Sequence, residues 1–192
     1  MCTLKSAQDV KLGFRCKKKK QIDIARVILY NNLVIIKGST ILIMRVAIGC
    51  DHGGIVLKSA VIETLQEYGA EIEDFGTYSE ASVDYPDYAL KVAEAVAGGK
   101  CDCGVIMCGT GIGISIAANK VKGIRAAVCT NTFMGEMTKR HNNANIIALG
   151  GRVITPDEAK AIVNAWLTAE YEGGRHQNRL DKISQIEDKY FK

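Results

Sequence analysis

The sequence predicts an α/β protein in which helices cover both faces of an open parallel sheet. Three observations lead to this class. Beyond Met44, short apolar runs alternate five times with stretches of helical period. The runs are almost entirely hydrophobic, as in strands that are buried on both faces. Reactive and glycine-rich segments follow several runs, and sheets of this class bind ligands at the carboxyl ends of their strands.

Hydrophobic periodicity defines the first two strand–helix units. Arg45–Cys50 is the first apolar strand, and a helix over Gly54–Tyr68 follows, with apolar residues recurring every three or four positions. Glu71–Phe75 alternates like a shorter strand. The next helix has apolar residues at i, i+3, i+4 and i+7 from Ala89, and Gly98 ends it.

The later units repeat this alternation. Gly104–Met107 is the third strand, and Ile114–Asn119 begins the helix after its glycine loop. Ile124–Cys129 leads into a helix near Thr132–His141, and Asn145–Leu149 is the fifth strand. A last helix of this region extends to about residue 169. Its start is well marked by an N-cap threonine, a proline and a capping glutamate at residues 155 to 158.

Composition and charge narrow the function classes. The chain has 192 residues, of which 47% are hydrophobic and 24% charged, as in an ordinary soluble globular protein with one full core. The net charge is +4, but residues 1–44 carry +7 and residues 45–192 carry −3. A nucleic-acid binder shows a basic patch on its folded domain, so we expect no nucleic-acid partner.

Cysteine and histidine spacing indicates neither a disulfide framework nor a metal site. The seven cysteines are an odd number and lie mostly on or beside apolar runs, which favours a reducing, cytoplasmic location. Cys101 and Cys103 lack a second ligand pair, and His52, His141 and His176 show no metal-ligand spacing. We therefore predict no bound metal.

Residues 1–43 are predicted to be an N-terminal extension outside the catalytic fold, and residues 44–192 to be one domain. Lys17–Lys20 and the apolar stretch after it imitate a secretory signal peptide, but polar residues interrupt the stretch and no small-residue cleavage site follows. Export and membrane association are not expected. Two short apolar runs could form a hairpin around Asn31-Asn32. We expect Met44 to be the natural start.

The junction between the third strand and its loop contains the most informative residue. Cys108 ends the strand and precedes Gly109, Gly111 and Gly113, a loop whose backbone N–H groups can turn inward toward an anion. The following helix would direct the positive end of its dipole at the sulfur and favour the thiolate. The alternative is a small buried cysteine beside a tight turn.

Other reactive residues follow the first and fifth strands. Asp51 and His52 come after the first strand, and Gly150-Gly151-Arg152 follows the fifth. We expect them to meet Cys108 at one crevice. Each also has a structural explanation, namely helix capping for Asp51, a solvated loop for His52 and a surface ion pair for Arg152.

Five motifs occur in order along the chain. They are Gly49–Gly54 (GCDHGG), Asp84–Pro86 (DYP), Cys108–Ser115 (CGTGIGIS), Arg140–Asn142 (RHN) and Gly173–Arg179 (GGRHQNR). Together they resemble the ribose-5-phosphate isomerase B family of sugar-phosphate isomerases. The resemblance covers about Met44 to Lys192, and the extension has no counterpart in it.

The resemblance implies a Rossmann-like three-layer α/β/α sandwich with a five-stranded parallel sheet. It implies reversible isomerisation of D-ribose 5-phosphate to D-ribulose 5-phosphate through an enediolate, without a metal or organic cofactor. Cys108 would be the catalytic base and His141 would open the sugar ring. The substrate-binding residues would be Asp51, His52, Tyr85, Gly109, Thr110, Gly111, Ile112, Gly113, Asn142, Arg152, Arg175 and Arg179.

These substrate-binding residues divide by task. Asp51 and Tyr85 would contact the sugar, Asn142 would hold its hydroxyls, and the N–H groups of residues 109–113 would stabilise the enediolate. The phosphate would be bound by His52, Arg152, Arg175 and Arg179. Arg175 and Arg179 are four residues apart, so on a helix both guanidinium groups point the same way. A solvated helix face would show the same spacing.

The resemblance also implies a homodimer or homotetramer with active sites at the subunit interface, acting on a phosphorylated pentose. Allose 6-phosphate and galactose 6-phosphate isomerases remain alternatives, because spacing does not measure a pocket. A sugar-phosphate sensor is a further alternative, although it needs neither a Cys base nor a ring-opening His. A dinucleotide site is disfavoured, because the glycines run G-x-G-x-G rather than G-x-G-x-x-G.

Overall fold

A five-stranded parallel sheet forms the centre of the Leu42–Lys192 unit in the computed structural model, which describes residues 27–30, 33–36 and 39–191. The strand order is β5-β4-β6-β8-β7, and neighbouring strands pair in parallel. These strands are β4 (Arg45–Cys50), β5 (Glu71–Asp74), β6 (Cys103–Cys108), β7 (Ala126–Val128) and β8 (Ile146–Gly150). The predicted α/β class and five-stranded parallel sheet are thus confirmed.

Six helices accompany the sheet among the described residues. They are α1 (Ile55–Glu67), α2 (Tyr85–Ala97), α3 (Ile112–Ala118), α4 (Thr132–Arg140), α5 (Pro156–Thr168) and α6 (Arg175–Tyr190). The predicted start of α5 is confirmed as a capping box. Thr155 Oγ1 accepts a hydrogen bond from the Glu158 N–H, and the Glu158 carboxylate accepts one from the Thr155 N–H.

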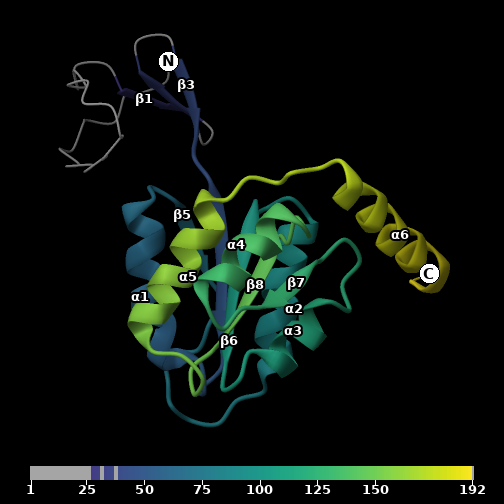
Figure 1. Cartoon of the computed structure of the whole chain (residues 1–192). Coiled ribbons are helices and arrows are strands. Elements are labelled where there is room, and N and C mark those ends of the chain that lie inside the picture. The colour runs from purple at the N-terminus through teal and green to yellow at the C-terminus, as the bar shows by residue number, and fades with distance from the viewer. Residues whose placement is uncertain (1–26, 31–32, 37–38, 192) are drawn as a thin grey trace, which may run out of the picture. The chain divides into compact units, whose positions relative to one another are not determined.

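Two hydrophobic cores lie on opposite faces of the sheet. Alternate strand residues such as Ile48 and Met107 pack with α1 and α5 on one face. Their neighbours, such as Ala47 and Ile106, pack with α2 and α3 on the other face. Figure 1 shows this arrangement, with α1 and α5 on one side of the strands and α2 and α3 on the other. The domain is the expected three-layer sandwich.

Two elements differ from their predicted bounds. α3 begins at Ile112, two residues earlier than expected, because Gly111 takes a positive φ of 78° and turns the chain directly into the helix. β7 covers only Ala126–Val128, because the preceding Arg125 N–H bonds to the Asn145 side chain instead of a strand partner. The glycine loop is therefore shorter, and Ile112 and Gly113 belong to the first helical turn.

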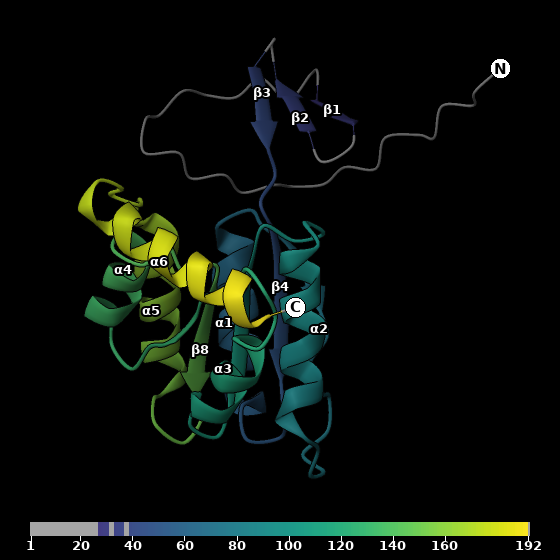
Figure 2. The ribbon, with the colours of Figure 1, turned by 90° about the vertical axis from the view of Figure 1, so that its right-hand side faces the viewer.

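The last helix, α6, follows a glycine pair and extends along one side of the domain. Its far end reaches the loop between α3 and β7, where the Glu187 carboxylate accepts hydrogen bonds from the Gly123 N–H and Asp188 pairs with Lys122 at 2.7 Å. Figure 2 shows this helix in front of the strands. Its first turn lies against the end of α4.

The other unit, Met1–Ile41, is described only in part. β1 (Val27–Tyr30), β2 (Leu33–Ile36) and β3 (Ser39–Leu42) form a three-stranded sheet, in which β1 and β2 pair antiparallel. This pairing agrees with the predicted hairpin. Its turn, Asn31-Asn32, and the basic run Lys17–Lys20 lie outside the described residues. No helix in the described part of the chain is long and apolar enough to cross a membrane.

Candidate active site

The loops that follow β4, β6 and β8 meet at the carboxyl edge of the sheet. The Asp51 N–H donates to the Met107 carbonyl at 3.2 Å, and the Arg152 N–H donates to the Gly109 carbonyl at 2.9 Å. A Cβ at Gly54 would lie 2.4 Å from the carbonyl carbon of Met107, so only glycine permits this approach. The predicted meeting of these strand ends is confirmed.

Cys108 lies at the centre of this edge. The residue is 4% exposed, and its Sγ accepts a hydrogen bond from the Gly111 N–H at 3.1 Å. Gly111 is required for two reasons, because its φ is positive and because a Cβ there would lie 3.1 Å from the Leu149 carbonyl carbon. The sequence thus places a backbone donor directly on the sulfur.

Three further predicted residues border the glycine loop. The ring of Tyr85 lies on Gly113, where an added Cβ would be 2.7 Å from the ring carbon Cζ. The guanidinium carbon of Arg152 would be 3.4 Å from a Cβ at Gly109. Thr110 is exposed, and its Oγ1 accepts a hydrogen bond from the Ile112 N–H at 3.3 Å. The loop therefore has a phenol, a hydroxyl and a guanidinium beside it.

Asp51 and His52 have defined hydrogen bonds in the loop after β4. Asp51 is 5% exposed, and its Oδ1 accepts from the N–H groups of Gly53 and Gly54 at 2.8 and 3.0 Å. These bonds fix the turn before α1, but Asp51 does not cap the helix as predicted, because the N-cap is Gly54 and no described side chain bonds to the first helical N–H groups. His52 Nδ1 accepts from the Val83 N–H at 3.2 Å. A neutral ring with an acceptor at Nδ1 has its proton on Nε2, where it can be donated to an oxyanion.

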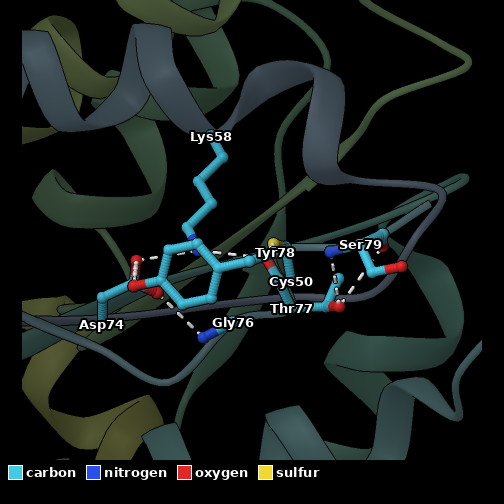
Figure 3. A network of polar contacts seen from close by, with 7 residues as sticks. All are labelled: Cys50, Lys58, Asp74, Gly76, Thr77, Tyr78 and Ser79. Carbon is cyan, nitrogen blue, oxygen red and sulfur yellow. Dashed lines mark hydrogen bonds and ion pairs between the residues drawn. The ribbon is translucent and has the colours of Figure 1, made fainter. Parts of the chain in front are cut away.

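A polar network around the buried Lys58 supports the loop that leads to Val83 and Tyr85 (Figure 3). Lys58 is 6% exposed, and its Nζ lies 2.8 Å from an Asp74 carboxylate oxygen, 3.0 Å from the Thr77 carbonyl oxygen and 3.5 Å from the centre of the Tyr78 ring. The Tyr78 hydroxyl donates to the same carboxylate at 2.7 Å. These contacts hold the end of β5 and the start of the loop against α1.

The remaining predicted residues lie on α4 and α6. His141 is the C-cap of α4 and is partly exposed, and Asn142 after it is exposed. Arg175 and Arg179 are both exposed on the first turns of α6. The four side chains come from two helix ends that pack together through His141 and His176, whose rings stack with centroids 4.3 Å apart.

These two groups of residues lie at opposite edges of the sheet within one chain. Cys108 ends β6, whereas the segment after α4 returns to the start of β6, where the Asn145 carbonyl accepts from the Gly104 N–H at 2.9 Å. β6 is six residues long, so its two ends are about 17 Å apart. One chain therefore does not bring Cys108 and His141 together.

The other described cysteines are buried structural thiols. Burial raises the pKa of Cys50 to about 11, and it raises the pKa of Cys103 and Cys129 to about 12. A thiol with such a pKa stays protonated at neutral pH and is a poor base. Cys101 is also buried, and burial together with nearby Glu73 raises its pKa to about 11.

One cluster has the composition of a metal site but not the geometry. His141, Glu172 and His176 offer three ligand atoms within 4.8 Å of one another. The two imidazole planes, however, are parallel within 5°. An ion between parallel rings would lie outside both ring planes, where the nitrogen lone pairs do not point. These residues therefore do not fit a metal ion.

Sequence reasoning missed three residues at or beside the site. The sequence motifs do not single out Lys58 or Glu172, and they assign no role to His176. The spacing of Glu172 and His176, four residues apart and next to Arg175, was the available signal. No local pattern marks Lys58, because its partners come from a different element.

The fold and the glycine loop with its cysteine define a class of α/β enzyme, the sugar-phosphate isomerases. A profile of the Ribose/Galactose Isomerase family matches residues 46–183, and the chain belongs to this family. The protein is an isomerase. The ribose-5-phosphate isomerase B of Escherichia coli is 51% identical over 145 residues, which cover 76% of this chain and 97% of the relative.

Solved structures give the same result. A ribose-5-phosphate isomerase B from Clostridium thermocellum is 58% identical, with a TM-score of 0.75 over 77% of this chain and 99% of that one. The enzyme from Mycoplasma genitalium with bound ribulose-5-phosphate is 39% identical, with a TM-score of 0.72 over 76% of this chain and 97% of that one. The Rossmann-like architecture is thus shared with solved members of the family.

Proposed function

We propose that this isomerase interconverts D-ribose 5-phosphate and D-ribulose 5-phosphate. The observation that carries the proposal is the placement of Cys108 Sγ under a backbone donor at the meeting point of three strand ends. Relatives named for this reaction match nearly their whole length, and the solved structure from M. genitalium contains ribulose-5-phosphate. Both facts favour a phosphorylated pentose as the substrate.

The first chemical step opens the sugar ring. The C1–O4 bond breaks, its electron pair goes to O4, and O4 takes a proton while the C1 hydroxyl loses one, which leaves an aldehyde at C1. We assign the proton exchange at O4 to His141, because an imidazole exchanges protons near neutral pH. Ribulose 5-phosphate has its O5 esterified and no five-membered ring available, so the ketose enters as an open chain.

The second step moves a proton between neighbouring carbons. The Cys108 thiolate takes the proton from C2, the electron pair of that C–H bond forms the C1=C2 double bond, and the C1=O π pair moves onto O1 to give the enediolate. The proton then returns from the sulfur to C1, the O2–H proton is transferred to O1, and the electron pair left on O2 forms the carbonyl at C2. Backbone N–H groups of the Gly109–Gly113 loop would stabilise the enediolate oxygens, and losing one such donor typically costs about 10²- to 10³-fold in rate.

The complete site needs a second copy of the chain. Cys108 ends β6, whereas His141 lies toward the start of β6, and the two ends of this strand are about 17 Å apart, which no side-chain movement spans. A neighbouring copy that brings its α4 and α6 ends to the Cys108 loop would join the two groups. We therefore propose a homodimer, or a homotetramer built from two such dimers, in which each site contains residues of two subunits.

Hybrid dimers test this arrangement. We expect a purified hybrid of one Cys108→Ala chain and one Arg179→Ala chain to have about half of the wild-type activity, because one of its two sites is intact. A hybrid in which one chain has both substitutions and the other has none should be nearly inactive when both hybrids are assayed with ribose 5-phosphate well below the wild-type KM, because one site lacks Cys108 and the other lacks Arg179. The opposite order of activities would place each whole site within one chain.

The α6 arginines are proposed to bind the phosphate together with His52 and Arg152 of the neighbouring copy. Arg179→Ala removes one guanidinium from this clamp, so we expect KM for ribose 5-phosphate to rise about 10- to 100-fold. Steady-state kinetics measures the change. Lys189→Ala removes the same charge from the far end of α6 and should leave KM within about 2-fold. Unchanged kinetics in Arg179→Ala would remove it from the clamp.

The direct test of the proposed reaction is a coupled assay of the full chain. Ribose 5-phosphate, allose 6-phosphate and galactose 6-phosphate are compared side by side, and the highest kcat/KM is expected with the pentose. A preference for a hexose would assign the chain to one of the alternative isomerases of this architecture. Binding of all three sugars without turnover would indicate a sensor.

The N-terminal extension and the cellular compartment of the protein are the last two features that we propose. We propose that residues 44–192 contain the whole catalytic fold and that residues 1–43 are dispensable for the reaction, since the family match begins at residue 46. We also propose a reducing, cytoplasmic environment, in which the five cysteines of the described region stay as free thiols.

A further inference from the structure

His176 and His141 form a face-to-face pair that joins two helices. Their ring centroids are 4.3 Å apart and their planes differ by 5°. His141 comes from the end of α4, and His176 from the first turn of α6. The two rings differ in exposure, because the side chain of His141 is 37% exposed and that of His176 is 5% exposed. The His141 ring is therefore accessible to a ligand, whereas the His176 ring is buried behind it.

The polar atoms of His176 do not explain its place in the fold. Its Nε2 is buried and has no hydrogen-bond partner within the part of the chain that the structure describes. Leaving a buried polar atom without a partner costs free energy, so a histidine here is not favoured by folding alone. What the ring does contact is the face of His141. The ring face of His176 therefore packs directly on the imidazole of His141.

The surroundings of His176 favour the neutral form of its imidazole. Burial lowers the pKa of His176, and the nearby His141, Arg175 and Arg179 lower it further. His176 is therefore neutral at pH 7. A flat neutral ring against the imidazole of His141 gives a favourable stacking contact.

Glu172 anchors the pair from the side. One of its carboxylate oxygens accepts a hydrogen bond from Arg140 Nε at 2.8 Å, and its N–H donates to the Arg140 carbonyl at 3.0 Å. The other oxygen lies 3.7 Å from His141 Nε2 and 3.5 Å from His176 Nε2. Hydrogen bonds from Arg140 lower the pKa of Glu172, so the carboxylate is ionised near both rings.

We propose that His176 is a positioning residue for the ring-opening step, which holds the His141 imidazole by face-to-face stacking beside the fixed Glu172 carboxylate. This inference rests on the proposed function. His141 follows the last turn of α4, where an isolated side chain would sample several rotamers. Proton transfer to a ring oxygen needs a donor at hydrogen-bond distance and in line, and a small misplacement reduces the rate strongly.

The test compares the two directions of the reaction in His176→Ala. Only the aldose has a ring to open, so a misplaced His141 leaves cyclic ribose 5-phosphate bound but unreactive. We expect kcat from ribose 5-phosphate to fall about 10-fold or more. KM in that direction falls in parallel, because the equilibrium constant fixes the ratio of the two kcat/KM values. With ribulose 5-phosphate, kcat should stay within about 2-fold.

Two further variants separate stacking from folding. His176→Phe keeps a flat ring and removes both nitrogens, so we expect it to restore kcat from ribose 5-phosphate to within about 3-fold of wild type. Leu180→Ala removes a side chain that is 7% exposed and one turn further along α6. It should loosen the docking of the helix without changing the ratio of the two kcat values.

The outcomes distinguish this inference from the proposed function. Equal losses in both directions for His176→Ala, no loss at all, or a His176→Phe variant as slow as His176→Ala would overturn the positioning role. A wild-type chain that does not interconvert the two pentose phosphates would instead overturn the proposed function. Thermal unfolding of each variant shows whether a uniform loss follows from reduced stability.

Discussion

Cys108→Ala is expected to lower kcat by about 10³-fold or more while KM for either pentose phosphate stays within about 3-fold. The substitution removes the sulfur that would take the C2 proton and leaves the phosphate-binding groups in place. The glycine loop should keep its conformation, because within the described part of the chain this side chain accepts one hydrogen bond, from the Gly111 N–H. Steady-state kinetics in both directions measures the effect.

A matched variant on the same strand controls for packing. Cys103→Ala removes a thiol of equal size, 6% exposed, at the opposite end of β6, and should leave kcat within about 2-fold of wild type. Loss of C2–H exchange with solvent in Cys108→Ala would support the same step independently. Turnover within 10-fold of wild type in that variant would show that another group is the base.

His141→Asn should affect the two directions of the reaction unequally. An amide is neither a general acid nor a general base near neutral pH, so we expect kcat from cyclic ribose 5-phosphate to fall about 10²-fold or more. Open-chain ribulose 5-phosphate needs no ring opening, and its kcat should stay within about 3-fold. KM for ribose 5-phosphate decreases together with its kcat, as it does when a substrate also binds unproductively.

The neighbouring residue provides the control for His141. Asn142→Ala changes an exposed side chain one position further along and would weaken substrate binding in both directions alike. A symmetric loss of kcat in His141→Asn would contradict its assignment to ring opening. It would place this imidazole in the isomerisation step or in substrate binding.

Most of the fold could be predicted from the sequence because the strands are buried on both faces. Each of the five apolar runs is a strand in the structure, and the capping residues before α5 act as predicted. The boundaries that differed depend on backbone geometry. A helix beginning directly at Ile112 needs the positive φ of Gly111, and periodicity does not report φ.

The candidate site was predicted less completely, because its residues meet through the chain's topology. A helix that follows a parallel strand returns to the amino edge of the sheet, which places His141 far from Cys108. This consequence could have been drawn from the strand–helix alternation. The pairing of His141 with His176 could not, because it depends on how α4 and α6 pack.

Lys58 shows a different limit of sequence reasoning. Periodicity assigns lysines to solvated helix faces, but Lys58 is 6% exposed and paired with Asp74. Burying an ammonium is costly unless it is paired and hydrogen-bonded. The contacts that stabilise the buried Lys58 come from β5 and the loop after it, so no local pattern in α1 predicts them.

The tight glycine contacts at the carboxyl edge restrict how this enzyme can diverge toward other sugars. A Cβ at Gly151 would lie 2.3 Å from the Gly53 carbonyl oxygen, and one at Gly150 would lie 2.7 Å from the Thr110 carbonyl carbon. Even a methyl group would separate the loops there. Adaptation to a longer or shorter carbon chain must therefore proceed through side chains at the rim, such as Tyr85 and Thr110, while the backbone beneath them stays constant.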